Sequence, residues 1–494
     1  MTERTPEALP RVARPPLAVT ALVLTAVYAA TASRYDYHRD ELYFRMLEPA
    51  WGYVDQPPLT PLLAQAAIAV FGDSLWALRV PAMLCMLATL WLAVLITREF
   101  GGGPRAQTVC AAGLAFAGVS VSMGHMLATA TVDIPVWTAV LLFTARALRR
   151  ADPRWWLAAG AAVGVGLYNK HLVVLLLISL AVALLVVGPR RVLRSGHLWA
   201  GVGLALLIGA PNLLYQALNG WPQLEMASVI AETKGPDARV ELLPFQPVLL
   251  ALMTPIWIAG VIALLRRPHW RGARALAVAY PVLLVIVLIA GGQMYYPLGL
   301  VIALFAIGCV PTAEWMRRGR WREWTVIGAV GLNTAVSAVI GLPLVPAERL
   351  GETPLPEVNS SLPDQLGWQA YVEQIGEVYQ GLPEADAASA VVIASNYGEA
   401  GAVDRYGDAW GLPEVYSGHN HLRHYGPPPE TATVVVTVGI PLPRVEGFFE
   451  DCEAAATLDN GIGVDNEEQG RTVGVCRGPV EAWGELWPHF QHYS

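Results

Sequence analysis

Residues 155–188, WWLAAGAAVGVGLYNKHLVVLLLISLAVALLVVG, form two apolar runs joined by the short turn Tyr168-Asn169-Lys170-His171. A helix needs about 20 apolar residues to cross the roughly 30 Å hydrocarbon core of a membrane, and each run approaches that length. Lys170 is one of only two lysines in the chain. Because an ammonium group at membrane depth is costly, Lys170 must either reach water or meet a carboxylate or a phosphate. The stretch predicts a transmembrane hairpin whose turn carries a cation.

Apolar runs of the same kind recur along the first 343 residues and predict a polytopic α-helical membrane protein. We expect eleven crossings, within a range of ten to thirteen because several runs are short. The expected spans are 16–33, 75–97, 106–123, 133–148, 155–169, 171–188, 198–216, 246–265, 275–291, 295–313 and 325–343. The apolar run Leu59–Phe71 is short and follows Pro57-Pro58, so we expect it to lie at the membrane interface.

Composition divides the chain into two parts. Of its 494 residues, 54% are apolar and 15% are charged, and the mean hydropathy is +0.42. Soluble proteins have about 25% charged residues, so this composition excludes intrinsic disorder and argues against an ordinary cytosolic enzyme. Residues 344–494 hold 23 acids and 6 bases, whereas residues 1–343 hold 17 acids and 27 bases. An apolar, basic block before an acidic block predicts a membrane domain followed by a water-soluble domain.

The distribution of Lys and Arg predicts the orientation, because cytoplasmic loops carry an excess of these residues. With the N-terminus inside, the inner segments hold 20 of the 33 bases and the short outer segments hold seven. Eleven crossings then place residues 344–494 outside. We therefore expect a multi-pass plasma-membrane protein with a cytoplasmic N-terminus and an extracytoplasmic C-terminal domain. The first span ends in Ala30-Thr31-Ala32, but its length favours an uncleaved anchor.

These boundaries predict four parts of the chain. They are a cytoplasmic N-terminal tail (1–15), a transmembrane catalytic domain (16–343) with a first outer loop (34–74), a Pro-rich linker (344–364) and an extracytoplasmic α/β domain (365–494).

The C-terminal part has the pattern of a small α/β domain. Ala390–Ser395 and Thr431–Val438 are predicted to be buried strands, and Tyr371–Gln380 and Phe448–Thr457 are predicted to be helices. In an oxidising compartment its two cysteines, Cys452 and Cys476, either form a disulfide or remain free thiols.

The first outer loop carries the densest set of ionisable side chains. Residues 34–45 read RYDYHRDELYFR, and residues 51–59 read WGYVDQPPL. A solvated loop with surface ion pairs is one explanation. The many aromatic residues, and the double proline that fixes the backbone, favour a functional strip. Asp133, at the outer start of a later span, either caps its helix or takes part in catalysis.

The outer loops combine acids that could transfer protons with cations that could bind an anion, and they are accessible from the bilayer. This combination suits transfer of a group from a lipid-linked phosphate to a hydroxyl or an amine. A carboxylate serves as general base in such a step, and the departing phosphate needs positive charge. No glycine-rich nucleotide-binding pattern follows a strand, so nothing supports a nucleotide donor bound in the cytosol. No His, Cys and Asp cluster has metal-ligand spacing, which leaves open only a carboxylate-bound divalent ion near Asp40.

Five motifs resemble those of a known family in their order and spacing. They are HRDELYF (38–44), GYVDQPPLTPLL (52–63), TATVDIP (129–135), YNKHLV (168–173) and QMYYPLGL (293–300). Together they resemble the bacterial glycosyltransferase family 39 group, which includes protein O-mannosyltransferases and aminoarabinose transferases acting on lipid A. The resemblance covers roughly residues 16–343. It implies a GT-C fold, a polyprenyl-phosphate sugar donor, inversion at the anomeric carbon and, in most members, no metal.

The resemblance also implies roles for the acidic residues. Asp40 matches the loop aspartate that acts as catalytic base, with Glu41 beside it. Asp133 matches the second acidic residue, which arranges acceptor and donor, so Asp40 and Asp133 are expected to converge on one external cavity. The loop strip that approaches the donor phosphate is matched by Asp55, Gln56, Pro57 and Pro58.

The donor-phosphate ligands depart from the family pattern. Many members have Lys or His where Gln56 stands, and Lys where Gln293 stands. The positive charge that neutralises the donor phosphate would then come from other residues of the same loops and turns. The residues expected to contact the donor phosphate or lipid are Lys170, Arg39, Arg45, Gln56, Tyr295, Tyr296 and His125.

The sequence therefore predicts an integral membrane glycosyltransferase that moves a hexose or pentose from a polyprenyl-phosphate donor, by inverting displacement with Asp40 as base. The expected partners are this donor, membrane lipids and a protein, cell-wall glycan or glycolipid acceptor, with no nucleic acid. The outer domain either binds the acceptor or has a structural role. Its polar candidates are Tyr397, Glu399, Tyr406, Tyr416 and His419.

Two other functions compete with this prediction. A transporter or flippase of lipid-linked sugars would also have many helices and outer charges. Such proteins have broken helices and polar residues near mid-membrane in matching halves, whereas here the polar residues gather at one face and no repeat is visible. A cell-wall-binding module on a membrane anchor would not need eleven spans.

Overall fold

The computed structural model describes residues 9–150 and 152–493. Of the predicted cytoplasmic tail, residues 1–8 lie outside the described residues. The chain divides into two compact units. The helical unit comprises Met1–Thr31, Gln56–Leu59 and Arg79–Leu342, and the α/β unit comprises Ala32–Asp55, Thr60–Leu78 and Pro343–Ser494.

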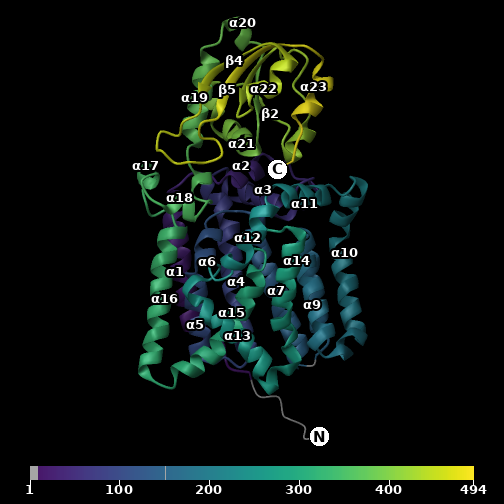
Figure 1. Cartoon of the computed structure of the whole chain (residues 1–494), viewed down its shortest axis with the longest axis vertical. Helices are drawn as coiled ribbons and strands as arrows, with labels where there is room; N and C mark the ends of the chain where they lie inside the picture. Colours follow the sequence, from purple (N-terminus) through teal and green to yellow (C-terminus); the bar gives the residue numbers. More distant parts are fainter. Residues whose placement is uncertain (1–8, 151, 494) are drawn as a thin grey trace. The chain divides into compact units, whose positions relative to one another are not determined.

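The helical unit is a bundle of α-helices that run side by side (Figure 1). Its helices are α1 (Arg14–Thr31), α4 (Leu75–Glu99), α5 (Pro104–Ala115), α6 (Gly118–Met123), α7 (Thr129–Arg150), α8 (Trp155–Leu167), α9 (Val173–Val187), α10 (Gly196–Leu218), α11 (Pro222–Thr233), α12 (Gly235–Phe245), α13 (Thr254–Arg266), α14 (Ala275–Ala290), α15 (Leu298–Met316) and α16 (Arg320–Gly341). The predicted polytopic helical architecture is confirmed.

Among the described residues, six helices are long and apolar enough to cross a membrane, namely α1, α4, α7, α10, α15 and α16. Shorter apolar helices correspond to the remaining predicted spans, with one exception. The run 106–123 is divided between α5 and α6, because the backbone leaves the helical conformation at Phe116 and Ala117. The segment after α10, which was expected to be an outer loop, contains α11 and α12.

Small residues let neighbouring helices approach closely. A Cβ atom on Gly160 of α8 would lie 2.1 Å from the carbonyl oxygen of Gly201 in α10, and one on Gly308 of α15 would lie 1.8 Å from that of Ile256 in α13. Real Cβ atoms do not make such contacts, so these positions require glycine. Packing through small residues is characteristic of membrane helices, which have no hydrophobic drive to associate.

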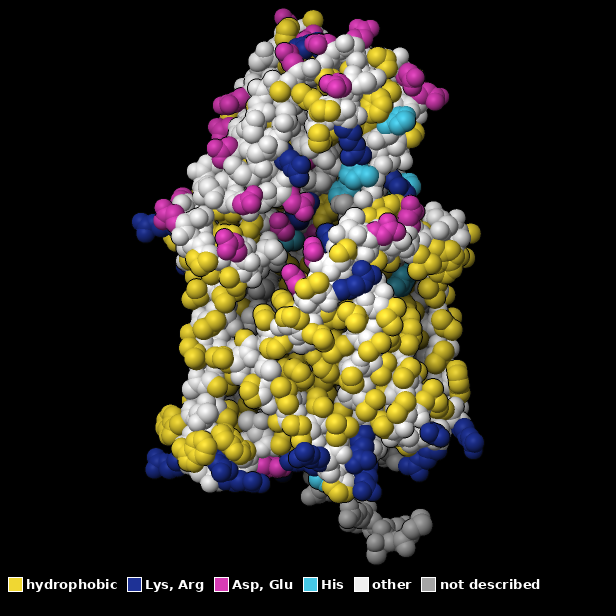
Figure 2. Space-filling view, viewed as in Figure 1, with side chains coloured by type: hydrophobic (Ala, Val, Ile, Leu, Met, Phe, Trp, Pro, Cys, Tyr) yellow, Lys and Arg dark blue, Asp and Glu magenta, His cyan; other side chains and the backbone are white. Residues whose placement is uncertain are grey.

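Basic side chains gather at one end of the helical unit. Figure 2 shows most of the Lys and Arg side chains on the visible face of this unit at one end, with hydrophobic side chains over its flank. At that end Glu99, which terminates α4, accepts hydrogen bonds from Arg150 at 2.8 and 2.5 Å and lies 3.6 Å from Arg146. This is the charge distribution on which the predicted orientation rests.

The α/β unit is built on a five-stranded sheet with the order β2-β1-β3-β5-β4. Its strands are β1 (Ala390–Ala394), β2 (Val415–Ser417), β3 (Val434–Val438), β4 (Phe449–Thr457) and β5 (Thr472–Pro479). β1 pairs in parallel with β2 and β3, and β5 pairs antiparallel with β3 and β4. The predicted small C-terminal α/β domain is thus confirmed, and both predicted apolar strands are present.

Helices cover both faces of this sheet (Figure 1). On one face, Ile393 and Val435 pack with Trp483 and Trp487 of α23 (Trp483–Phe490). On the other face, the core around Val434 receives Val378 and Tyr379 of α19 (Trp368–Gln380). The helix predicted for Tyr371–Gln380 is therefore present and begins three residues earlier.

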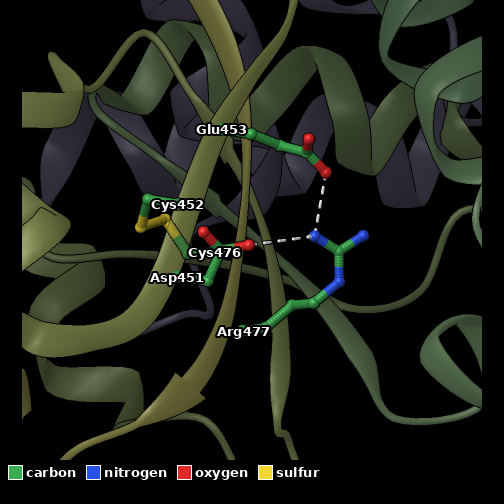
Figure 3. The surroundings of a disulfide bond; sticks show 5 residues. All are labelled: Asp451, Cys452, Glu453, Cys476 and Arg477. Atoms are coloured by element: carbon green, nitrogen blue, oxygen red, sulfur yellow. Dashed lines mark hydrogen bonds and ion pairs between the residues drawn. A yellow bond between two sulfur atoms is a disulfide. The ribbon is translucent and has the colours of Figure 1, made fainter.

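The helix predicted for Phe448–Thr457 is wrong, because this segment forms the edge strand β4. Its Ala-rich composition favours a helix locally, but cross-strand pairing with β5 overrides that preference. Cys452 lies opposite Cys476 in the register, and the two form a disulfide (Figure 3). On the same strands Arg477 binds Glu453 at 2.9 Å and lies 3.8 Å from Asp451.

The α/β unit contains more than residues 365–494. It includes α2 (Arg39–Met46), most of α3 (Leu59–Phe71) and the segment from Pro343 onward. The first outer loop, 34–74, was expected to belong to the transmembrane domain. In the structure this loop packs on α21 (Tyr397–Tyr406), where a Cβ atom on Gly401 would lie 2.7 Å from the Cβ atom of Leu42.

Candidate active site

The helix α2 begins with a capping box that fixes its first turn. The Nδ1 atom of His38 accepts a hydrogen bond from the backbone N–H of Asp40 at 3.2 Å. The Oε2 atom of Glu41 accepts one from the backbone N–H of His38 at 2.9 Å. Reciprocal bonds of this kind satisfy N–H groups that a helix terminus leaves unpaired. Glu41 is fully buried and holds the helix start, whereas Asp40 is partly exposed.

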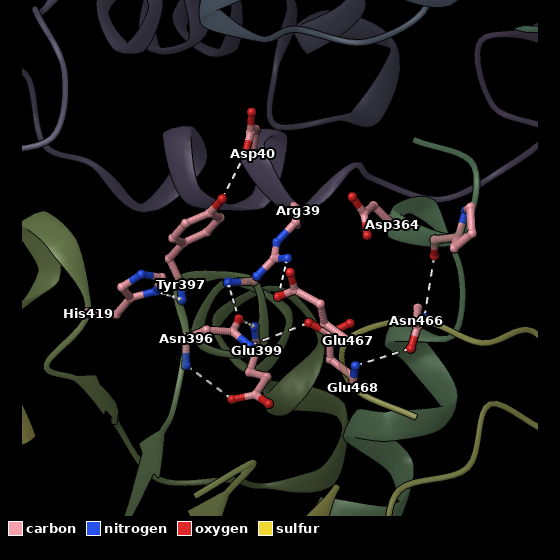
Figure 4. A network of polar contacts seen from close by, with 12 residues as sticks. Arg39, Asp40, Asp364, Asn396, Tyr397, Glu399, His419, Asn466, Glu467 and Glu468 are labelled. Atoms are coloured by element: carbon pink, nitrogen blue, oxygen red, sulfur yellow. Dashed lines mark hydrogen bonds and ion pairs between the residues drawn. The ribbon is translucent and has the colours of Figure 1, made fainter. Parts of the chain in front are cut away.

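The carboxylate of Asp40 is held by a residue of the C-terminal segment. The phenol of Tyr397, at the start of α21, donates a hydrogen bond to Oδ1 of Asp40 at 3.0 Å (Figure 4). Burial and the neighbouring Asp40 carboxylate raise the pKa of Tyr397 well above its usual value, so the phenol keeps its proton. Within the described residues, Oδ2 of Asp40 has no hydrogen-bond partner.

Aromatic contacts fix the ring of Tyr397. It stacks on Tyr43 with a centroid distance of 4.6 Å and on His419 with a distance of 4.9 Å. The guanidinium carbon of Arg39 lies 5.1 Å from the same ring centroid. The Nδ1 atom of His419 also accepts a hydrogen bond from the backbone N–H of Tyr397 at 3.0 Å. The phenol therefore has little freedom to leave Asp40.

A second pair of a carboxyl group and a phenol lies beside the first. The phenol of Tyr43, which stacks on Tyr397, accepts a hydrogen bond from the backbone N–H of His421 at 3.2 Å and interacts electrostatically with Asp55. Burial raises the pKa of Asp55 to about 7, although the Tyr43 phenol acts in the opposite direction. Oδ1 of Asp55 is buried and has no partner among the described residues. Asp55, expected only as loop scaffold, thus carries a proton for much of the time near neutral pH.

The two arginines expected at the donor phosphate are bound to carboxylates within the α/β unit. Arg39 is buried and pairs with Glu467, which lies beside Glu468 (Figure 4). Arg45 binds Asp73 at 2.8 Å and also pairs with Asp404. Their positive charges are therefore largely neutralised in place.

Of the other outer-domain candidates, Tyr406 donates a hydrogen bond to Oδ1 of Asp36 at 2.5 Å. Tyr416 donates one to Oε2 of Glu414 at 2.7 Å. Glu399 is buried and closes a capping box with Asn396 at the start of α21. These three residues do not hydrogen-bond to Asp40, and among the five candidates only Tyr397 does so in the described part of the chain.

In the helical unit, the turn between α8 and α9 is hydrogen-bonded to two other segments that were expected to contribute to the site. The carbonyl of Tyr168 accepts a hydrogen bond from the backbone N–H of Leu59 at 2.8 Å, which attaches the strip containing Gln56, Pro57 and Pro58. Nδ2 of Asn169 donates to the carbonyl of Thr129 at 2.8 Å, which attaches the start of α7.

Lys170 occupies the centre of this turn. Its Nζ atom lies 5.9 Å from the ring centroid of Tyr295 and 5.2 Å from that of Tyr296, so two aromatic faces attract the ammonium. The carboxyl of Asp133 on α7 interacts electrostatically with Lys170. The structure thus brings together three segments of the helical unit that the sequence assigned to one site.

Three buried polar atoms of these segments lack partners in the described part of the chain. They are Nε2 of Gln56, Nε2 of Gln293 and Oδ1 of Asp133. A buried donor or acceptor without a partner costs about 1–3 kcal/mol, so native proteins rarely leave one unsatisfied except where a ligand or water binds. The two amide donors stand where the family pattern has cations, and both suit the oxygen atoms of a phosphate.

His125 does not supply positive charge. It is buried, and its Nε2 atom donates a hydrogen bond to the carbonyl of Thr31 at 2.7 Å. Burial, with the nearby guanidinium of Arg79, lowers the pKa of His125 to about 3. Arg79 is itself only 4% exposed. Its place five residues into the apolar run 75–97 is a sequence signal of burial.

No group of three or more His, Cys, Asp or Glu side chains is placed to hold a metal ion within residues 9–150 and 152–493.

Comparisons with known proteins identify the fold. Residues 55–215 match the model of the dolichyl-phosphate-mannose-protein mannosyltransferase family. No curated protein matches the chain. Among solved structures, ArnT from Cupriavidus metallidurans bound to undecaprenyl phosphate is similar with a TM-score of 0.61 and 16% identity, over 93% of this chain and 97% of that chain. The apo state of the same ArnT is similar with a TM-score of 0.59 and 14% identity, over 93% of this chain and 97% of that chain.

A third structure, the arabinofuranosyltransferase AftD from Mycobacteria, is similar with a TM-score of 0.51 and 13% identity, over 95% of this chain and 40% of that chain. At such identities the likeness concerns the fold. The predicted GT-C fold class is confirmed.

Proposed function

We propose that this chain, a glycosyltransferase family 39-like protein with the GT-C fold, transfers a sugar from a polyprenyl-phosphate donor to a hydroxyl or amine acceptor at the outer face of the membrane. The match over residues 55–215 supports a glycosyltransferase. The undecaprenyl phosphate bound to ArnT, a protein of the same fold, supports a lipid-phosphate donor. The acceptor is a protein, a cell-wall glycan or a glycolipid.

In the proposed step, Asp40 is the general base. Its Oδ2 atom takes the proton from the acceptor hydroxyl as the acceptor oxygen attacks the anomeric carbon. The bond between that carbon and the phosphate oxygen breaks, and its electron pair leaves with the lipid phosphate. Configuration at the anomeric carbon inverts in this single displacement. Tyr397 acts as a positioning residue, because its hydrogen bond occupies Oδ1 and leaves Oδ2 for the acceptor.

The departing phosphate gains negative charge, which must be stabilised where it develops. We assign this role to Lys170, with the amide donors of Gln56 and Gln293 binding phosphate oxygens. Tyr295 and Tyr296 hold the ammonium group in place through their ring faces. Asp133 is assigned to the arrangement of acceptor and donor, as the family resemblance implies.

The orientation belongs to the same proposal. The basic end of the helical unit is assigned to the cytoplasm, in keeping with the excess of Lys and Arg in inner loops. The C-terminal segment is then extracytoplasmic, where an oxidising environment stabilises the disulfide between Cys452 and Cys476.

The observation that carries the proposal is the carboxylate of Asp40, presented by the first turn of a capped helix and held through one oxygen by Tyr397. The test uses the full chain in proteoliposomes with undecaprenyl-phosphate mannose, glucose or arabinose, and with membranes from a deletion strain as the source of unmodified acceptor. A transferase releases free undecaprenyl phosphate only when acceptor membranes are present. Movement of intact lipid-linked sugar across the bilayer without release would instead support a flippase.

A further inference from the structure

The α/β unit contains a polar crevice of about 260 Å³ that none of the roles assigned above uses. It opens at the carboxyl ends of the parallel strands β1 and β3. Ser395 and Asn396, which directly follow β1, line it together with Gly439, which directly follows β3. Arg444 and Arg471 complete its basic side.

The crevice lies where the sheet connections diverge. The chain leaves β1 through α21 and returns as β2 on one side of β1. It leaves β3 through α22 (Leu442–Val445) and returns as β4, beyond β5 on the other side. In open α/β sheets, ligands bind outside the carboxyl ends of the strands at such a switch point. The order of the strands alone therefore predicts a ligand-binding position at this crevice, whatever residues line it.

Glycine is required at the end of β3. Gly439 has a φ of +69°, and a Cβ atom there would lie 2.0 Å from Oε1 of Glu399. A side chain at this position would both strain the backbone and collide with the wall of the crevice.

The charge around the crevice favours an anion. Residues 344–494 hold 23 acids and only 6 bases, yet two of those bases, Arg444 and Arg471, line this one crevice. Neither guanidinium forms an ion pair with a carboxylate in the described part of the chain. Arg471 donates through Nε to the backbone carbonyl of Glu467 at 2.9 Å, which leaves its terminal nitrogens for other partners.

The carboxyl groups nearby do not cancel this positive charge. Glu467 is paired with Arg39. Burial raises the pKa of Glu399 to about 8, and the adjacent Glu468 acts in the same direction, so Glu399 is mostly protonated at neutral pH. The N-terminus of α21, which begins after Asn396, adds the partial positive charge of the helix dipole.

We propose that this crevice binds a small hydroxylated ligand through its phosphate or carboxylate group, with Arg444 and Arg471 contacting the anion. Ser395, Asn396 and His492 offer hydrogen bonds to the hydroxyl groups. This oxyanion site is independent of the proposed transferase activity, because it requires no chemistry at Asp40.

Isothermal titration of the purified full chain, without donor, tests the site. The probes are glucose 6-phosphate, glucuronate and glycerol phosphate, with glucose as the neutral comparison, at low salt because exposed charges are screened by ions. We expect saturable binding of at least one anionic probe, at least tenfold tighter than glucose. Arg444→Gln combined with Arg471→Gln should weaken that binding at least tenfold, whereas Arg349→Gln, an exposed base outside the crevice, should not.

The outcomes separate the sources of the ligand. Preference for glucose 6-phosphate or glucuronate supports a soluble or glycan-borne sugar acid, and preference for glycerol phosphate supports a phospholipid headgroup. The proposal is overturned if no anionic probe binds saturably, if glucose binds equally well, or if the double variant binds like the wild type. None of these results bears on the role of Asp40.

Discussion

The phenol of Tyr397 donates a hydrogen bond to Oδ1 of Asp40 at 3.0 Å, across 357 positions of sequence. Both residues belong to the α/β unit, which contains the C-terminal segment together with residues 32–55 and 60–78. The C-terminal segment therefore contacts the proposed base directly.

Tyr397→Phe removes this hydrogen bond and keeps the stacked ring. A hydrogen bond to a charged group contributes about 1.5–3 kcal/mol, so we expect kcat to fall roughly 10- to 100-fold. The KM for the donor and the unfolding midpoint should change little, because the ring still packs between Tyr43 and His419. Tyr416→Phe, which removes an exposed hydroxyl bonded to Glu414, is the matched control. An unchanged kcat in Tyr397→Phe would exclude the positioning role.

Gly401→Ala tests the packing of α2 on α21. The new methyl group would lie 2.7 Å from the Cβ atom of Leu42, so α2 must shift and carry Asp40 with it. We expect a loss of about 1–3 kcal/mol in stability, as for other overpacked sites, and a clear drop in kcat. Gly447→Ala introduces the same methyl group where no atom lies within 4 Å, and it should behave like the wild type. Equal activity of the two variants would contradict the coupling of α21 to α2.

Lys170→Gln tests the donor-phosphate role. Loss of the ammonium group removes the charge that stabilises the departing phosphate, and we expect kcat to fall about 100-fold or more. The chain supplies its own control, because Lys234, the only other lysine, is exposed in the cap of α11. Steady-state release of polyprenyl phosphate is measured for both variants. Equal kcat values for Lys170→Gln and Lys234→Gln would contradict the role of Lys170 and would mean that another cation stabilises the phosphate.

Asp55 makes stability depend on pH in a defined direction. Its pKa in the folded protein is about 7, against an ordinary value of 3.8. The folded state therefore binds more protons than the unfolded state between about pH 4 and 7, and stability falls as the pH rises through this interval. Asp55→Asn removes this cost at nearly unchanged side-chain volume, so its unfolding midpoint should exceed that of the wild type by roughly 2 °C above pH 7.

The difference between Asp55→Asn and the wild type should shrink as the pH falls from 7 toward 4, because the unfolded state then begins to bind the proton that the folded state already holds. Thermal unfolding from pH 4 to 8.5 measures it, with the exposed Asp408→Asn as control. A constant difference across this range would mean that burial does not raise the pKa of Asp55.

The elements that could be predicted from the sequence are those that depend on a local pattern of residues. The two apolar runs of residues 155–188 form α8 and α9, and the lone lysine lies in the turn between them as expected. β4 was mistaken for a helix because FFEDCEAAAT has helical composition, and only pairing with β5 makes it a strand. Local preference and tertiary pairing conflict there, and pairing is invisible in a single chain.

Contacts between segments far apart in the sequence could not be predicted from local patterns. Motif resemblance assigned Lys170, Tyr295 and Tyr296 to the donor phosphate or lipid, but the contact of Lys170 with the two tyrosines was not predicted, since no periodicity links positions so far apart. The hydrogen bond between Tyr397 and Asp40 had no such motif, because Tyr397 lies outside the region of resemblance. The pairing of Arg39 and Arg45 with carboxylates was likewise missed, since it depends on the folding of residues 404 and 467 against the first loop.

The most direct measurement is the rate of sugar transfer by Asp40→Asn in proteoliposomes, beside Asp36→Asn, which changes an aspartate of the same loop that is bonded to Tyr406. General base catalysis contributes about 10²- to 10⁴-fold, so Asp40→Asn should lose roughly 1,000-fold in kcat while donor binding and the unfolding midpoint stay as in the wild type. Asp36→Asn should retain most of its activity. Transfer by Asp40→Asn at the wild-type rate would contradict the account.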